Sequence, residues 1–149
     1  MVKRFESFVS GITACYRHIQ KIKSIEMTEL GLKGTHAMCV FYLNRHDKGL
    51  TASQLSSLCE EDKAAVSRTL SELSEKGYIN TNRDETKKKS RSVITLTEKG
   101  RELAKNVDVL IGQWVGLGGD GLTNEEREIF YFVLDKIANN LKTNTKEKA

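Results

Sequence analysis

A group of small and polar side chains between positions 64 and 71 has the chemistry needed to read DNA bases. Arginine can donate two hydrogen bonds to guanine, serine can donate or accept, and the methyl groups of alanine and threonine fit against thymine. At about 100° per residue, a helix over this stretch presents Ala64, Arg68 and Ser71 on its free side. Ser67 and Thr69 flank them. Because many surface helices look like this, the pattern favours a DNA-reading role without establishing it.

Positive charge is concentrated shortly after this stretch, in the loop between positions 80 and 93. Its basic residues are Arg83, Lys87, Lys88, Lys89 and Arg91, against only two acidic residues, Asp84 and Glu85. Three adjacent lysines repel one another unless they face solvent or phosphate. A solvated loop is the simpler interpretation of an isolated charge run. Its position beyond a base-reading helix instead favours contact with phosphate or with the minor groove.

The elements that must position these groups are two short helices and a hairpin. Thr51 and Gln54 have the spacing of a capping box, and Asp62 is a second N-cap after a short polar turn. Val66, Leu70 and Leu73 form the stripe that buries the second helix, which stops at Gly77. Strand-like patterns follow at 78–79 and 93–96. The sequence therefore predicts a mainly α fold with a small β-hairpin wing, a winged helix-turn-helix.

Amphipathic helices are expected on both sides of this unit. Apolar residues recur every three or four positions from Phe5 to Ile25, and again in 103–114 and 129–137. These stripes carry more apolar surface than a core of this size needs, which predicts an intertwined homodimer. The expected organisation is a single subunit with dimerisation helices at 1–30 and 101–141, a DNA-binding lobe at 31–100 and a disordered tail at 142–149.

Composition and charge are compatible with this organisation. The chain has 149 residues, 38% hydrophobic and 30% charged, with a formal net charge of +4. No apolar run approaches the roughly 18 to 20 residues of a membrane span. The first residues lack the apolar core and cleavage site of a signal peptide, so we expect a cytoplasmic protein without a membrane partner.

The residue types that serve in catalysis or metal binding are present but scattered. His18, His36 and His46 belong to no known catalytic or metal motif, and each is most simply a surface or helix-end residue. Residues 116–121 formally spell Gly-x-Gly-x-x-Gly, yet they follow a helix instead of a strand and are better interpreted as a connector. We expect no enzymatic activity, no cofactor and no metal.

The three cysteines are odd in number and widely spaced. Neither a disulfide framework nor a zinc site follows from that pattern. Cys39 and Cys59 lie in apolar helical contexts and are expected to pack in the core. Cys15, on the first helix, is expected to be more open, and a redox-sensing role for it is kept as a less favoured hypothesis.

Several segments together resemble the MarR family of bacterial and archaeal transcription regulators. The resemblance is carried by 50–58, by Val-Ser-Arg in 62–70, by Lys-Gly-Tyr-Ile in 73–79 and by Leu-Thr-Glu-Lys-Gly in 94–100. It implies a homodimer with interlocked terminal helices, a second helix-turn-helix element in the major groove and a wing tip in the minor groove. Family members usually repress their own and neighbouring genes. Many of them release DNA in response to a small, often aromatic compound or an oxidant.

Carried over by position, the resemblance implies that Ala64, Ser67, Arg68 and Thr69 face the groove. The wing departs from the family's Asp-x-Arg pattern because Asp84 is far from Arg91. Lys88, Lys89 or Arg91 would then reach the DNA instead.

The function expected from these features is sequence-specific regulation of transcription. The protein would act as a repressor, bind double-stranded DNA at an inverted-repeat operator as a homodimer, and respond to a small-molecule effector. Two alternatives remain open at this point. One is a thiol-based redox sensor of the same fold with Cys15 as the reactive group. The other is a winged domain used for protein contacts without DNA binding.

Overall fold

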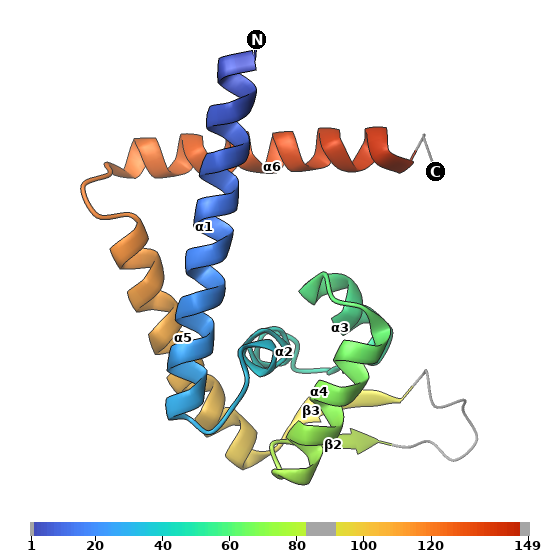
Figure 1. Ribbon diagram of the computed structural model, residues 1–149. Helices are drawn as coiled ribbons and strands as arrows, with labels where there is room; N and C mark the ends of the chain where they lie inside the picture. The colour runs from blue at the N-terminus through green and yellow to red at the C-terminus, as the bar shows by residue number, and fades with distance from the viewer. Residues whose placement is uncertain (1, 83–91, 147–149) are drawn as a thin grey trace. The chain divides into compact units, whose positions relative to one another are not determined.

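The computed structural model describes residues 2–82 and 92–146, and the described elements are mainly helical (Figure 1). Two compact units, 1–110 and 111–149, divide the chain within its fifth helix. None of the described helices is long and apolar enough to cross a membrane. In chain order the elements are α1 (Val2–Glu29), α2 (Gly34–Asn44), β1 (Leu50–Thr51), α3 (Ala52–Cys59), α4 (Lys63–Glu75), β2 (Ile79–Asn82), β3 (Val93–Leu96), α5 (Glu98–Gly118) and α6 (Asn124–Lys146).

The helix-turn-helix consists of α3 and α4, and its caps are those predicted from the sequence. The Gln54 amide donates to Oγ1 of Thr51 at 3.2 Å, while the Thr51 amide donates to Oε1 of Gln54 at 2.8 Å. At the start of α4, the Ala65 amide donates to Oδ1 of Asp62 at 2.8 Å. Glu60 reverses the chain between the two helices in the left-handed conformation, with φ of 54°. Local capping therefore fixes where both helices begin.

The wing is the antiparallel pair β2 and β3, to which β1 adds a third strand in the order β1-β3-β2. Ile79 pairs with Leu96, and all three isoleucine and leucine side chains at Ile79, Ile94 and Leu96 are buried. The sequence pattern predicted the β2–β3 pair but not β1. Leu50 is a strand residue because it pairs with Ile94. The winged helix-turn-helix prediction is confirmed, with one more strand than expected.

The core of the first unit receives one side chain from each of its five helices. Met27, Val40, Leu55, Leu73 and Val107 come from α1, α2, α3, α4 and α5, and all are fully buried. Since interiors are close-packed, these side chains fix the position of α4 relative to the other helices. Leu58, the next-to-last residue of α3, is 37% exposed and lies outside this core.

A close backbone approach joins the exit of α4 to the start of α5. Gly77 has φ of +73° and ends the helix in the left-handed region. A Cβ atom on Gly100 would collide with the carbonyl oxygen of Tyr78. Thr97 caps α5 with its Oγ1, which accepts from the Gly100 amide at 3.0 Å. The Lys-Gly-Tyr-Ile and Leu-Thr-Glu-Lys-Gly segments thus meet in space, and the second glycine is required there.

Two helices expose long apolar surfaces. On α1 the exposed residues are Val2, Phe5, Phe8, Val9, Ile12, Tyr16, Ile19 and Ile25. On α6 they include Ile129, Phe130, Tyr131, Phe132 and Val133. Soluble monomers seldom leave apolar patches of this extent uncovered.

Candidate nucleic-acid interface

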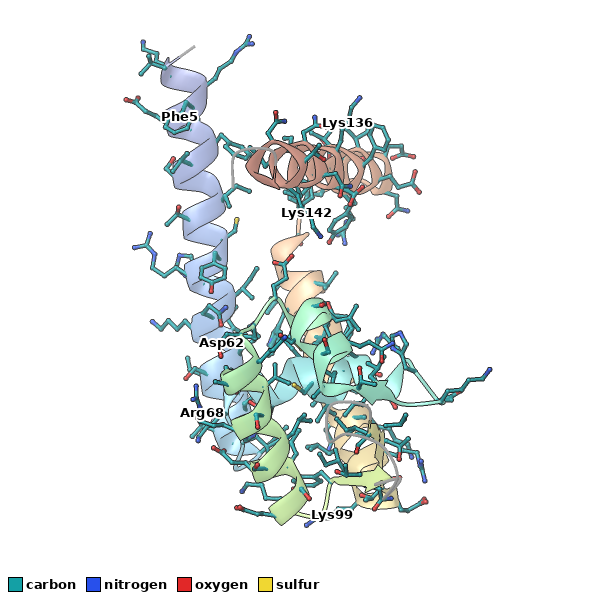
Figure 2. All side chains as sticks on the ribbon, turned by 90° about the vertical axis from the view of Figure 1, so that its right-hand side faces the viewer. Phe5, Asp62, Arg68, Lys99, Lys136 and Lys142 are labelled. Atoms are coloured by element: carbon teal, nitrogen blue, oxygen red, sulfur yellow. The ribbon has the colours of Figure 1, made fainter. Side chains whose placement is uncertain are left out.

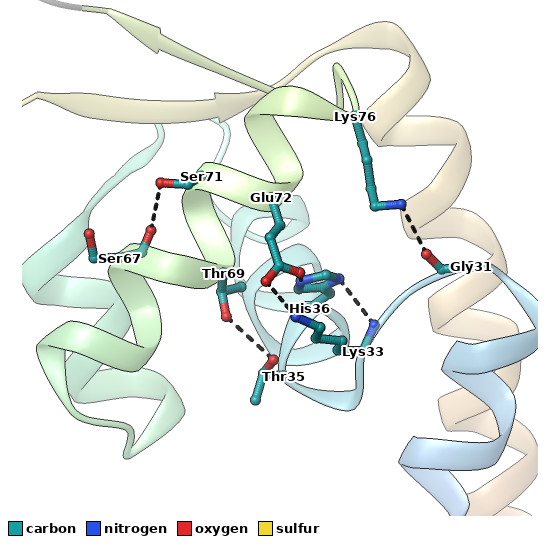
Figure 3. Close-up of polar contacts among 9 residues, drawn as sticks. All are labelled: Gly31, Lys33, Thr35, His36, Ser67, Thr69, Ser71, Glu72 and Lys76. Atoms are coloured by element: carbon teal, nitrogen blue, oxygen red, sulfur yellow. Dashed lines mark hydrogen bonds and ion pairs between the residues drawn. The ribbon is translucent and has the colours of Figure 1, made fainter.

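The free side of α4 carries most of the residues predicted to read bases. Ala64, Ser67, Arg68 and Ser71 are exposed, and Arg68 lies six residues after the N-cap Asp62, nearly two turns into the helix (Figure 2). Within the described part of the chain, Arg68 makes no hydrogen bond or ion pair, so its five N–H donors are available. The Ser71 hydroxyl donates to the Ser67 carbonyl at 3.1 Å (Figure 3) and keeps an acceptor free.

Thr69 does not lie on this free side, and the prediction that it faces a groove is wrong. The side chain is 5% exposed, and its hydroxyl donates to Oγ1 of Thr35 on α2 at 3.3 Å (Figure 3). Thr69 is three residues after Val66 and four before Leu73, so it continues the buried stripe. Leu70 is only half-buried. The hydroxyl of Thr69 ties the back of α4 to α2 instead of reading DNA.

The basic positions of the wing fall on residues 83–91. Arg83, Lys87, Lys88, Lys89 and Arg91, with the acidic Asp84 and Glu85, therefore lie outside the described residues. Their contact with phosphate or the minor groove stays a prediction. The described strands β2 and β3 lead into and out of this segment (Figure 1).

A polar cluster braces α4 from behind (Figure 3). Nζ of Lys33 donates to Oε1 of Glu72 at 2.5 Å, and the Lys33 amide donates to Nδ1 of His36 at 3.1 Å. Nε2 of His36 lies 3.1 Å from Oε2 of Glu72 without the geometry of a hydrogen bond. The start of α2 is thus held to the middle of α4, on the side away from the free surface.

His36 was expected at the surface or at a helix end. It does lie at a helix end, but it is not at the surface. It stands in the first turn of α2, but its side chain is 1% exposed. Nδ1 accepts a backbone N–H, which leaves the single ring proton on Nε2 in the neutral form. The only sign in the sequence that His36 is buried was the apolar run that follows it. That run does not reveal Glu72, 36 positions away, as its neighbour.

Burial lowers the pKa of His36 in spite of the nearby Glu72 carboxylate, which acts in the opposite direction. The hydrogen bond from Lys33 lowers the pKa of Glu72 in turn. His36 is therefore neutral and Glu72 ionised near neutral pH, so the cluster carries one ion pair, Lys33 with Glu72. The brace does not need a charged histidine.

A pH dependence of stability follows from the neutral His36. Its folded pKa lies below the ordinary 6.5, so the unfolded chain binds this proton first as the pH falls. The contribution of neutral His36 to the free energy of unfolding is fully present above pH 6.5. It declines as the pH falls from 6.5 to the folded pKa, and it does not change further at lower pH. We expect urea unfolding from pH 7.5 to 5 to show a loss of stability that is smaller in His36→Asn. Equal slopes for both proteins would contradict the assignment.

Three further contacts hold the C-terminal end of α4. Nζ of Lys76 donates to the Gly31 carbonyl at 3.2 Å (Figure 3), and Nζ of Lys99 donates to the Lys76 carbonyl at 2.8 Å. The Thr97 hydroxyl donates to the Gly77 carbonyl at 2.8 Å. The middle and the C-terminal end of the helix are thus anchored, which supports its free side.

The other candidate chemistry is limited in the described ranges 2–82 and 92–146. No group of three or more His, Cys, Asp or Glu side chains there is arranged to hold a metal ion. Cys15 is exposed on α1, as expected, and its redox role stays a hypothesis. The glycine-rich stretch at 116–121 was interpreted as a connector, but α5 extends to Gly118, so its first half is helical and residues 119–123 connect α5 to α6.

Comparison with known proteins agrees with the resemblance to the MarR family seen in the sequence. Residues 30–90 match a family model described as MarR family. A search of curated proteins found no significant match. Among solved structures, a MarR transcriptional regulator from Methanosarcina mazei Go1 is similar at a TM-score of 0.77 and 26% identity, over 92% of each chain.

Two other solved structures share the fold at lower identity. One is described as a MarR family transcriptional regulator from Listeria monocytogenes in complex with 26mer DNA, with a TM-score of 0.79, 23% identity, and 91% of this chain and 89% of that chain covered. The other is a Staphylococcus aureus MarR in complex with salicylate and kanamycin, with a TM-score of 0.79, 20% identity, and coverage of 95% and 94%.

Proposed function

Because this chain belongs to the MarR family of transcriptional regulators, we propose that it binds an inverted-repeat operator as a homodimer and represses transcription. The observation that carries the proposal is the free side of α4. It presents Arg68 without a partner in the described chain, beside the small residues Ala64 and Ser67. The opposite side of the helix is braced by Glu72 and Thr69. A rigid helix with small side chains and one free guanidinium suits entry into a major groove.

The wing supplies the second set of contacts in this proposal. We propose that the lysines of residues 83–91 neutralise phosphates of the DNA backbone while α4 occupies the major groove. The Listeria monocytogenes protein, which has the same fold, was determined with DNA. Phosphate contacts add affinity without sequence preference, whereas α4 supplies the preference. In this division of roles, salt weakens binding chiefly through the wing.

The homodimer is supported by the exposed apolar surfaces of α1 and α6. Each helix leaves large side chains in solvent when the subunit is alone, among them Phe5 and Phe132. Covering such surfaces with a second copy removes them from water. Two copies of α4 related by a two-fold axis would read half-sites about one helical turn apart, roughly 34 to 36 Å.

Regulation by a small molecule is the finer part of the proposal. The Staphylococcus aureus protein of this fold was determined with salicylate and kanamycin. We propose that a small effector releases this chain from its operator in the cytoplasm. Such a ligand acts by binding the form that does not fit DNA more tightly, and it can weaken the complex only by that difference in affinity.

Substitution of Arg68 provides the direct test. We expect Arg68→Ala to weaken binding to an operator, selected from random duplexes, by about 1 to 3 kcal/mol, with a much smaller effect on random DNA. Arg68→Lys keeps the charge but loses the planar fork, so it should retain little of the preference. Lys88→Ala should weaken all sequences nearly equally and reduce the salt dependence. Fluorescence anisotropy titrations at several salt concentrations measure all three.

Two outcomes would overturn the proposal. Equal losses on specific and random duplex for Arg68→Ala would remove α4 as the reading element. Failure of the folded, dimeric protein to enrich any duplex, together with weak salt dependence, would favour a winged domain used for protein contacts.

A further inference from the structure

Two of the three cysteines lie in contact between α2 and α3. The Sγ atoms of Cys39 and Cys59 are 3.9 Å apart, although the residues are 20 positions apart in the chain. A disulfide has an S–S length of about 2.05 Å, so the 3.9 Å gap must close by roughly 1.9 Å. Cys59 is the last residue of α3, where the helix gives way to a turn. A side-chain rotation with a small shift of this helix end would bring the two sulfur atoms together.

We propose that Cys39 and Cys59 form a reversible intrachain disulfide on exposure to a hydroperoxide, and that this disulfide weakens DNA binding. Its effect on DNA rests on the proposed function, whereas formation of the disulfide does not. The site differs from the exposed Cys15 on α1, because it needs no second subunit and contains its own resolving thiol.

The surroundings assign different roles to the two thiols. Cys59 is half-buried and can meet a small oxidant, whereas Cys39 is buried behind it. The hydrogen bond from Cys39 lowers the pKa of Cys59, helped by Lys23 on α1 and opposed by burial and by Glu61. The same contact and burial raise the pKa of Cys39. Since the thiolate is the nucleophile, Cys59 attacks first and Cys39 resolves.

The reaction balances with hydroperoxide as the only oxidant. The Cys59 thiolate attacks the peroxide, an S–O bond forms, the O–O bond breaks, and the released hydroxide takes up a proton to become water. The Cys39 sulfur then attacks the Cys59 sulfenic acid. An S–S bond forms, the S–O bond breaks, and the hydroxyl leaves as water with the thiol proton of Cys39. The two thiols together lose two electrons and two protons, the peroxide is reduced to water, and a dithiol reductant reverses the change by exchange.

The disulfide acts on α4 through the turn that follows Cys59. Residues 60–62 form this turn and contain the left-handed Glu60 and the N-cap Asp62. The Ser56 hydroxyl donates to the Glu61 carbonyl at 2.6 Å, which couples the turn to α3. Drawing Cys59 toward α2 therefore displaces the first turn of α4, where Ala64 stands on the free side. A misplaced N-terminus of the reading helix reduces the fit to the groove.

The test uses the full-length chain and hydrogen peroxide. Trypsin separates the three cysteines, because Cys15 falls in 5–17, Cys39 in 34–45 and Cys59 in 49–63. After peroxide treatment, mass spectrometry should find 34–45 linked to 49–63 with the loss of two hydrogens. Affinity for the selected operator should fall about tenfold and return with dithiothreitol. Amide hydrogen exchange should increase in 60–66 of the oxidised protein.

Matched variants separate this site from other effects of peroxide. Cys59→Ser and Cys39→Ala should each bind the operator in the reduced state and keep that affinity after peroxide, whereas Cys15→Ser should respond as the natural chain does. A link between two 5–17 peptides, or no link at all, would overturn the proposal. A 34–45 to 49–63 link that leaves affinity and exchange unchanged would overturn its regulatory part. If the reduced protein binds no duplex but the link and the exchange change appear, the proposed function fails while the thiol switch stands.

Discussion

Replacing Leu73 with alanine is expected to lower the free energy of unfolding by about 2 to 5 kcal/mol. Leu73 is 0% exposed and lies on the buried side of α4, one residue after Glu72 of the polar brace. Removing its side chain costs the transfer free energy of the buried groups and leaves a cavity behind a helix that is anchored at its C-terminal end. Urea unfolding monitored by circular dichroism, with constant protein concentration, measures this change.

The matched control is Leu70→Ala on the same helix. Leu70 has the same side chain and the same helical propensity change, but it is only half-buried. Its substitution should cost clearly less than that of Leu73, because fewer of its contacts are lost. Equal losses for the two variants would mean that α4 packs through Leu70 and that its free side is oriented differently from the structure.

This pair of leucines also shows where interpretation of the sequence reached its limit. Steps of three and four residues both continue a helical stripe, so 66–70–73 and 66–69–73 are equally regular. Hydrophobicity selected Leu70 over Thr69. The structure buries Thr69 instead, because Thr35 on α2 offers its hydroxyl a partner. A partner 34 positions away in the chain cannot be inferred from periodicity.

Signals between near neighbours were reliable by contrast. The capping box of Thr51 with Gln54, the N-cap Asp62 and the stop at Gly77 each depend on residues within a few positions, and all are confirmed. The local capping and turn residues at these points agree with the helix-turn-helix that the whole chain adopts. The predicted hairpin is also confirmed, and buried and less buried residues alternate along β3.

Long-range features were missed or left open. The brace of Lys33 and His36 on Glu72 joins residues more than 35 positions apart. The contact of Cys39 with Cys59 joins two helices, and widely spaced cysteines gave no sign of it. The exposed groups on α4 that are proposed to read the operator were thus largely predictable as a helix face, apart from Thr69. The groups that hold that face in place were not.

The amphipathic ends of the chain lead to the last prediction. We expect Phe132→Asp to dissociate the proposed homodimer at micromolar concentration and to weaken operator binding by about 10²- to 10⁴-fold. Phe132 is 68% exposed in the single subunit, so the substitution leaves the fold of the subunit intact. In the dimer the new carboxylate would be buried without a partner. Each monomer would then bind one half-site without the benefit of a tethered second one.

The control for this prediction is Asn140→Asp, which adds the same charge at an exposed polar position of α6. It should remain dimeric and keep its operator affinity. Light scattering gives the mass of each variant, and anisotropy titration on the two-half-site operator gives its affinity. On a duplex with a single half-site the natural chain and Phe132→Asp should differ far less, because the second reading helix has no site to occupy. If Phe132→Asp stays dimeric with unchanged affinity, the exposed face of α6 is not the surface that joins the two subunits.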